Sequence, residues 1–207
     1  MSPRIHPTAL VEDGVVLGQE TSVWDNAHLR RGAVVGNDCI IGGKSYLADS
    51  VIVGDRVKIN ANAYLCSGVT IETGVMVSAH VVFTNDRFPR ATSPDLAALR
   101  SSAIDEHTEH TLVREGATIG ARAVIGPGLT IGRFAMVGMG AVVTRDVPAL
   151  NLVVGSPART IAVVCRCGSP VARRDAADEP HEVLAVACPD CGRRYVVSGL
   201  EVAEPDE

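Results

Sequence analysis

The sequence predicts an all-β fold in which the chain winds as a parallel β-solenoid. Three observations carry this prediction: aromatic residues are only 3% of the chain, 20 of the 207 residues are glycine, and bulky apolar residues recur at every sixth position. Side chains two positions apart in a strand point to the same face, so each bulky residue shares the interior with the residue two before it. The sixfold positions are Ile5, Val11, Leu17, Val23, Leu29, Val35, Ile41, Leu47, Val53, Ile59, Leu65, Ile71, Val77 and Phe83.

Each group of six residues therefore predicts one short strand and one corner. The partner positions run from Ala9 to Val81, are small or β-branched, and carry no charge. Turn-forming pairs such as Gly18-Gln19 and Gly54-Asp55 follow the strands. A chain that turns after every six residues cannot enclose a core alone, so successive coils must stack. A barrel or sandwich of short strands is the alternative, but its strand spacing would drift with loop length.

The repeat is interrupted once, after Phe83, and resumes at Val113. We expect a loop insertion over residues 84–112, and a long loop inside a compact solenoid is usually functional. Serine and proline at Ser93 and Pro94 leave disorder in its middle as the alternative. The resumed sixfold positions are Val113, Ile119, Ile125, Ile131, Val137 and Val143.

Bulk charge and hydropathy argue against two classes of partner. The net charge is −5 and the pI is near 5.7, which gives no broad attraction for nucleic acid or an anionic membrane. No stretch reaches the roughly 18 uninterrupted apolar residues of a membrane span, and no signal-peptide core follows Met1. We therefore expect a cytoplasmic protein with neither nucleic-acid nor membrane partners.

Several local motifs indicate which family of β-solenoid proteins the sequence resembles. They are His6-Pro7-Thr8-Ala9, Val23-Trp24 with His28, Phe83-Thr84-Asn85 followed by Pro89-Arg90, Thr111-Leu112-Val113 before Gly116, and the segment 145–159 after the last hexad. With the hexads, these resemble the hexapeptide-repeat acyltransferases, and most closely the subfamily acting on UDP- or dTDP-linked 3-amino sugars, whose type members acetylate UDP-2-acetamido-3-amino-2,3-dideoxyglucuronate.

The resemblance implies a left-handed β-helix over residues 1–160 and an acetyl-CoA-dependent N-acetyltransferase that serves surface polysaccharide or glycoconjugate synthesis. It also implies a homotrimer with acceptor sites shared between subunits. A sugar amine is a competent nucleophile once it is unprotonated, whereas a sugar hydroxyl needs a positioned base. The family's role of holding the acceptor amine falls on Asn85, for which a turn asparagine is the alternative.

The remaining site predictions follow the same resemblance. His80 is a candidate base or sugar contact. If the protein is instead an O-acetyltransferase of the same fold, which is the alternative function, His80 would be the base. Asn60 and Asn62 match the family's polar corner one coil before the cleft and are candidate substrate-binding residues. Arg90 is a third candidate, because the planar guanidinium of arginine suits a phosphate or carboxylate. On the donor side, Gly138, Met139 and Gly140 would let acetyl-CoA approach the main chain closely, and Arg159 would meet its phosphates.

The C-terminal segment, residues 161–207, predicts a separate module. Cys165 and Cys167, then Cys188 and Cys191, form two thiol pairs about twenty residues apart, as in a four-cysteine zinc ribbon. The predicted Zn²⁺ site is structural, because four cysteines leave no open position for a substrate. Free thiols or another metal are the alternatives.

The sequence leaves two other functions to compare with the acyltransferase. Zinc ribbons often bind nucleic acid, but the stretch from Cys165 to Glu207 has five Arg against nine Asp or Glu, which opposes phosphate binding. A non-catalytic ribbon or scaffold protein stays open as the other-class alternative. A γ-type carbonic anhydrase would need three converging histidines, and His28, His80, His107 and His110 lack that arrangement.

Overall fold

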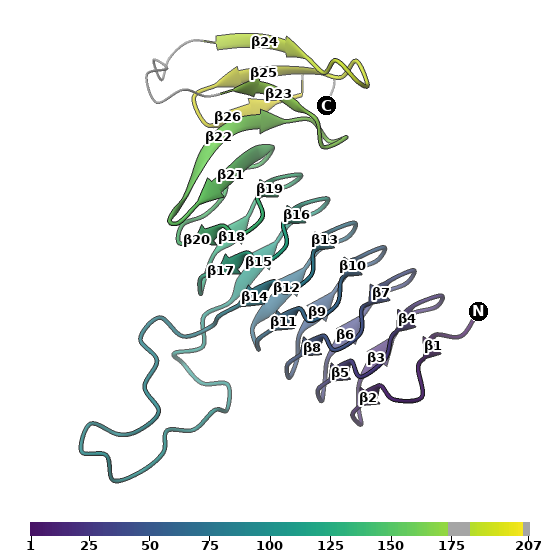
Figure 1. The fold of residues 1–207 in the computed structure, drawn as a ribbon, viewed down its shortest axis with the longest axis vertical. Coiled ribbons are helices and arrows are strands. Elements are labelled where there is room, and N and C mark those ends of the chain that lie inside the picture. The colour runs from purple at the N-terminus through teal and green to yellow at the C-terminus, as the bar shows by residue number, and fades with distance from the viewer. Residues whose placement is uncertain (174–182, 205–207) are drawn as a thin grey trace.

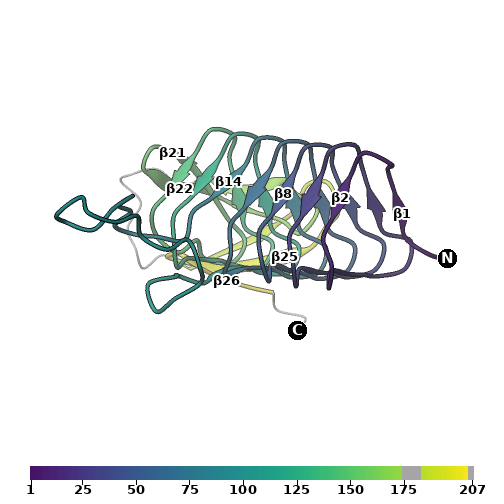
Figure 2. The same cartoon turned by 90° about the horizontal axis from the view of Figure 1, so that it is seen from below.

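The computed structural model describes residues 1–173 and 183–204, and in them the chain is all-β. The predicted left-handed parallel β-helix of stacked coils is confirmed (Figures 1 and 2). Its strands form three flat faces, which we call faces A, B and C in the order the chain visits them. Within the described residues no helix is long or apolar enough to cross a membrane.

The strands of the three faces are short. Face A holds β1 (Arg4–Ile5), β4 (Ser22–Val23), β7 (Ile40–Ile41), β10 (Lys58–Ile59), β13 (Met76–Val77), β16 (Thr118–Ile119) and β19 (Met136–Val137). Face B holds β2 (Leu10–Val11), β5 (His28–Leu29), β8 (Tyr46–Leu47), β11 (Tyr64–Leu65), β14 (Val82–Phe83), β17 (Val124–Ile125) and β20 (Val142–Val143). Face C holds β3 (Val16–Leu17), β6 (Val34–Val35), β9 (Ile52–Val53), β12 (Val69–Ile71), β15 (Thr111–Val113) and β18 (Thr130–Ile131).

Each coil takes three hexads, so parallel neighbours on one face are 18 residues apart. Arg4 pairs with Ser22 on face A, and Tyr46 pairs with Tyr64 on face B. This register puts the second residue of nearly every strand inside, where Leu29, Ile41 and Ile119 are fully buried. Ile5 differs from the prediction: it is 47% exposed because it lies in the first coil, which has only one neighbouring coil to pack against.

The backbone conformation at the corners explains why the repeat keeps a length of six residues. From Gly14 to His80, every sixth residue has a positive φ, between 52° and 87°, and the series continues from Gly116 to Gly140. This left-handed conformation turns the chain by one corner, and glycine or asparagine adopts it most readily. Lysine, arginine and histidine also occupy it here, as at Lys44, Arg56 and His80. The corner thus fixes a backbone conformation and leaves its side chain variable.

The inserted loop leaves the solenoid after β14 and returns at Thr111 (Figure 1). Its two ends are tied together, since the backbone N–H of Glu109 donates to the carbonyl of Asn85 at 2.9 Å. Further out, a bridge between Thr92 and Leu99 folds the loop back on itself. The loop therefore projects from the corner between faces B and C as a pinned excursion.

The C-terminal segment packs on the end of the solenoid (Figure 1). β21 (Asn151–Gly155) extends face A, and β22 (Ala158–Val164) and β23 (Pro170–Arg173) follow it antiparallel. A three-stranded sheet of β24 (Val183–Ala187), β25 (Arg194–Ser198) and β26 (Glu201–Ala203) completes it. β22 runs across residue 160, so a continuous sheet joins the two predicted domains. A second buried cluster holds Leu150, Val163, Cys165, Cys188, Tyr195 and Val197.

Candidate functional site

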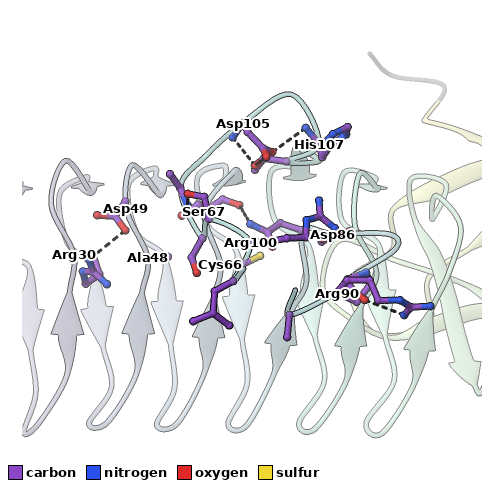
Figure 3. Close-up of a pocket in the computed structure, with 18 of the residues that line it drawn as sticks. Arg30, Ala48, Asp49, Cys66, Ser67, Asp86, Arg90, Arg100, Asp105 and His107 are labelled. Carbon is purple, nitrogen blue, oxygen red and sulfur yellow. Dashed lines mark hydrogen bonds and ion pairs between the residues drawn. The ribbon is translucent and has the colours of Figure 1, made fainter. Parts of the chain in front are cut away.

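A cleft of about 710 Å³ lies between face B and the inserted loop (Figure 3). Its solenoid side is formed by Arg30, Tyr46, Asp49, Tyr64 and by Cys66 and Ser67 at the corner between faces B and C. Its loop side includes Asn85, Asp86, Arg90, Arg100, Asp105 and His107. A volume of this size is ordinary for a small-molecule site. The cleft thus owes its existence to the single interruption of the repeat.

Aromatic rings form a ladder on the solenoid side of this cleft. His28, Tyr46 and Tyr64 occupy the outward position of three successive face B strands, so they lie one coil apart. The rings of Tyr46 and Tyr64 are stacked, with centroids 5.3 Å apart and planes 7° from parallel. His28 meets Tyr46 edge-on at 5.2 Å. Tyr64 remains 42% exposed at the end of the ladder.

A charged network holds the ladder in place. Arg30 donates to the Tyr46 hydroxyl at 2.8 Å, and its Nε lies 2.8 Å from a carboxylate oxygen of Glu12. His28 Nε2 lies 2.7 Å from the same oxygen of Glu12. The bond to His28 lowers the pKa of Glu12, and the bonds to Tyr46 and Glu12 raise the pKa of Arg30. Glu12 and Arg30 therefore stay ionised at neutral pH, and the network positions Tyr46 before any ligand arrives.

The charges on the loop side are unevenly paired. Asp86 accepts a hydrogen bond from the Phe88 N–H at 2.7 Å, and Asp105 accepts one from the His107 N–H at 2.9 Å. Arg90 donates only to the carbonyl of its neighbour Pro89, at 3.2 Å. In the described chain no carboxylate pairs with the guanidinium of Arg90 or Arg100. The carboxylates are thus engaged locally while two cations remain available to an anionic ligand.

Asn85 stands where the loop begins, at the edge of the cleft. Its side-chain Nδ2 donates to the Ser67 backbone carbonyl at 3.1 Å, and its backbone carbonyl accepts from the Glu109 backbone N–H. Since a carbonyl only accepts, this bond fixes which end of the amide faces Ser67 and leaves Oδ1 as an acceptor. Asn85 has no positive φ. The alternative of a turn asparagine in the left-handed conformation therefore loses its support.

The other acceptor-side predictions lie elsewhere on the solenoid. Asn62 and His80 are left-handed corner residues between faces A and B, with φ of 59° and 60°. They are stacked one coil apart, where the His80 N–H donates to the Ala61 carbonyl. Asn60 precedes the same corner. Strand β14 separates His80 from Asn85, so in one chain Asn85 and Arg90 share the cleft while His80, Asn60 and Asn62 do not.

The donor-side predictions share a corner with His80. Gly140 continues that column two coils further on, through the bonds of Arg122 to Ala79 and of Gly140 to Ala121. Met139 is 84% exposed there. A Cβ at Gly138 would lie 2.7 Å from Val154, so only glycine fits. Val154 pairs with Arg159 across the β21–β22 hairpin, which brings the predicted donor residues close together.

Sequence reasoning missed the ladder and Arg100. Tyr46 and Tyr64 are 18 residues apart, in the strand position just before a sixfold residue. That spacing was a usable signal once three hexads were known to make one coil. Arg100 had no such signal, because its place depends on how the loop folds back. Cys66 is 4% exposed, and burial raises the pKa of its thiol to about 12.

The four C-terminal cysteines converge, as their spacing predicts. The sulfurs of Cys165, Cys167, Cys188 and Cys191 all lie within 4.8 Å of one another. Cys165 and Cys191 are 3.3 Å apart, and Cys167 and Cys188 are 3.5 Å apart. Tetrahedral Zn²⁺ with bonds of about 2.3 Å spaces its sulfurs about 3.8 Å apart, so this donor set fits zinc. Hydrogen bonds from Ser169 lower the pKa of Cys167 to about 6, whereas the neighbouring thiols, Cys165 foremost, and burial raise the pKa of Cys191 to about 12, so the four thiols do not ionise alike.

Comparison with known families matches the repeats themselves. The family "Bacterial transferase hexapeptide (six repeats)" matches residues 50–85, and the "Hexapeptide repeat of succinyl-transferase" matches residues 32–67 and 115–145. These segments lie in the solenoid on either side of the inserted loop.

One relative and several solved structures are similar to the chain. The dTDP-3-amino-3,6-dideoxy-α-D-galactopyranose 3-N-acetyltransferase of Aneurinibacillus thermoaerophilus is 37% identical over 85 residues, which cover 41% of this chain and 40% of the relative. The chain thus aligns with about two fifths of that protein's length.

The solved structures share less sequence. An N-acyltransferase from Bacillus cereus in complex with dTDP and 3-hydroxybutyryl-CoA is 16% identical, with 80% of this chain and 84% of that chain covered and a TM-score of 0.40. A hexapeptide-repeat acetyltransferase from Vibrio cholerae complexed with acetyl-CoA is 24% identical, with 73% and 72% covered and a TM-score of 0.48. The repeats, the coiled fold and the sequence matches confirm the predicted resemblance to hexapeptide-repeat acyltransferases that act on nucleotide-linked amino sugars.

Proposed function

We propose that this protein is an acetyl-CoA-dependent N-acetyltransferase acting on the amine, at C3, of a nucleotide-linked amino sugar. One observation carries the proposal: the inserted loop makes a cleft with Asn85 at its edge and two cations, Arg90 and Arg100, that pair with no carboxylate among the described residues. The relative's 3-N-acetyltransferase activity agrees with it. The product would serve surface polysaccharide or glycoconjugate synthesis in the cytoplasm.

The reaction needs little acid–base machinery from the protein. The unprotonated amine attacks the thioester carbonyl, the C–N bond forms, and the C–S bond breaks as the tetrahedral intermediate collapses. The departing CoA sulfur takes up the proton that the nitrogen loses. Asn85 accepts a hydrogen bond from the amine at Oδ1 and aims its lone pair at the carbonyl, while Ser67 holds the other end of the amide.

We propose that the working site lies between subunits of a homotrimer. Asn85 and Arg90 belong to one corner of the solenoid, and His80, Asn60, Asn62 and the donor residues belong to another. A complete site requires the cleft corner of one subunit to meet the donor corner of a neighbour. On face C the outward residues Val16, Val34 and Ile52 are 57%, 40% and 50% exposed, an apolar stripe that a subunit contact would cover.

We further propose that Cys165, Cys167, Cys188 and Cys191 hold a structural Zn²⁺, since their sulfurs converge to within 4.8 Å of one another and four cysteines are a donor set typical of zinc. The ion would fasten β22 to the hairpin of β24 and β25. Cys165 also accepts a hydrogen bond from the Tyr195 hydroxyl at 3.0 Å, which orients it within the second buried cluster.

A thiol-release assay tests the proposed function. The purified protein is given acetyl-CoA with a panel of nucleotide-linked 3-amino and 4-amino sugars and the matching hydroxyl sugars. We expect CoA release with a 3-amino sugar and none with the hydroxyl sugars. Turnover of a hydroxyl sugar without turnover of any amine would overturn the acceptor assignment and return His80 to the role of base.

A further inference from the structure

We propose that the cleft binds a nucleoside diphosphate, with its planar base stacked on Tyr64 and its diphosphate held by Arg90 and Arg100. The inference rests on the proposed function in taking a nucleotide-linked substrate, and it adds how the nucleotide is recognised. It follows from three features of the described residues: an aromatic ladder that stops, a network that fixes it, and two available cations.

The ladder stops one rung short of the inserted loop. Tyr64 pairs in register with Val82 on the next coil, so a branched aliphatic side chain follows the last ring. Tyr46 stacks on one face of Tyr64, and no described aromatic residue contacts the other. Neighbouring strands lie about 4.8 Å apart, close to the spacing of stacked rings. The tyrosine ring is longer than the Val82 side chain and is 42% exposed, so a nucleobase would stack on the outer part of the Tyr64 ring, beyond Val82.

The platform is rigid before the base arrives. Tyr46, which backs Tyr64, is held by Arg30, and Arg30 is held by Glu12 and lies 3.6 Å from Asp49. Ring stacking on such a surface loses little conformational freedom and tolerates any base, because every base has a π face. The platform thus recognises that a base is present, without selecting which one.

The diphosphate accounts for the two arginines. Arg90 and Arg100 both line the cleft, and the carboxylates around them have other partners. A guanidinium binds phosphate oxygens in pairs, and two of them match two phosphates. Both come from the loop, whereas the rings come from the solenoid. Base and diphosphate would therefore be recognised by different elements, which separate substitutions can test.

A nucleoside diphosphate occurs both in a nucleotide-linked sugar and in CoA, and the experiment separates the two sources. Isothermal titration measures binding of UDP, dTDP, CoA and uridine to the purified full chain, without turnover. The variants are Tyr64→Ala, Tyr64→Phe and Arg100→Ala. Ile40→Ala and Lys58→Ala are matched controls, since each lies at the outward position of a face A strand.

We expect Tyr64→Ala to weaken UDP and dTDP about tenfold or more, and Tyr64→Phe to retain binding because the ring remains. Arg100→Ala should weaken UDP about tenfold while leaving uridine, which has no phosphate, within twofold. The controls should bind as the unchanged protein does. Circular dichroism of each variant checks its fold, and Tyr64→Phe with Arg100→Ala decides the matter if Tyr64→Ala does not fold.

Three outcomes would overturn the inference: UDP and dTDP fail to bind, Tyr64→Ala and Arg100→Ala leave their affinity unchanged, or the variants weaken CoA alone. The last result would assign the cleft to the donor. Acetyl transfer with unchanged UDP affinity in the variants sinks this inference and spares the proposed function. UDP binding that depends on Tyr64, without acetyl transfer to any amino sugar, would support this inference and contradict the proposed function.

Discussion

Replacing Asn85 tests whether its amide orients an acceptor or merely anchors the loop. Asn85→Ala removes one hydrogen bond, from Nδ2 to the Ser67 carbonyl at 3.1 Å. An ordinary hydrogen bond contributes about 0.5–1.5 kcal/mol, and losing it in a chain of this size lowers the melting temperature by about 1–6 °C. If Oδ1 also aims the amine, kcat/KM should fall about 100-fold, far more than the stability loss accounts for. Melting curves and thiol-release kinetics measure the two effects separately.

Asn37 offers a matched control on another corner. Its side chain accepts from the Gln19 N–H at 2.9 Å and donates to Asp55 at 3.2 Å, outside the cleft. Asn37→Ala should cost similar stability and leave kcat/KM within about twofold. In Asn85→Asp, a carboxylate oxygen replaces the donor facing the Ser67 carbonyl, so we expect it to lower the melting temperature further. An Asn85→Ala enzyme as active as Asn37→Ala would refute the orienting role.

The remaining predictions concern the core, the metal and pH. Ile41→Ala, at a fully buried position, should cost about 3 kcal/mol in urea unfolding, and Ile40→Ala, at 39% exposure, under about 1 kcal/mol; equal costs would contradict the strand pleat. Metal analysis should find about one zinc per chain, lost in Cys188→Ser; zinc retained by that variant would exclude the site. Burial raises the pKa of Cys66 from 9 to about 12, so the folded state holds this proton longer than the unfolded state. The free energy of unfolding should therefore fall as pH rises from about 9 towards 12, and less steeply in Cys66→Ala; identical slopes would reject this.

The fold could be predicted from the sequence because the six-residue pattern is local and is repeated many times. The same inward position is bulky and apolar in Leu29, Ile59 and Ile125, and each of them is fully buried. The cysteine cluster was readable for a similar reason, since a tight turn between Cys188 and Cys191 imposes the geometry. Ile5 escaped the rule because burial depends on a neighbouring coil, which position in the chain decides.

Only part of the candidate cleft could be predicted from the sequence. Asn85 and Arg90, at and after the break in the hexads, both line the cleft, and their roles stay predictions. His80 is close to Asn85 in sequence, but the five positions that separate them lead from one corner of the solenoid to the next. Tyr64 and Arg100 join the cleft through stacking of coils and folding of the loop. No sequence pattern marks Arg100, and the 18-residue spacing that marks Tyr64 has meaning only once the length of a coil is known.

The left-handed corners have a consequence for how such a protein diversifies. Along the column of Asn26, Lys44, Asn62, His80 and Arg122, a constant backbone displays five side chains at intervals of one coil. Exchanging one for another alters the chemistry of the outer edge without moving the scaffold, because the interior never contacts them. The column holds exchangeable side chains at equivalent backbone positions, one coil apart. New binding preferences can therefore arise by single substitutions that leave the core unchanged.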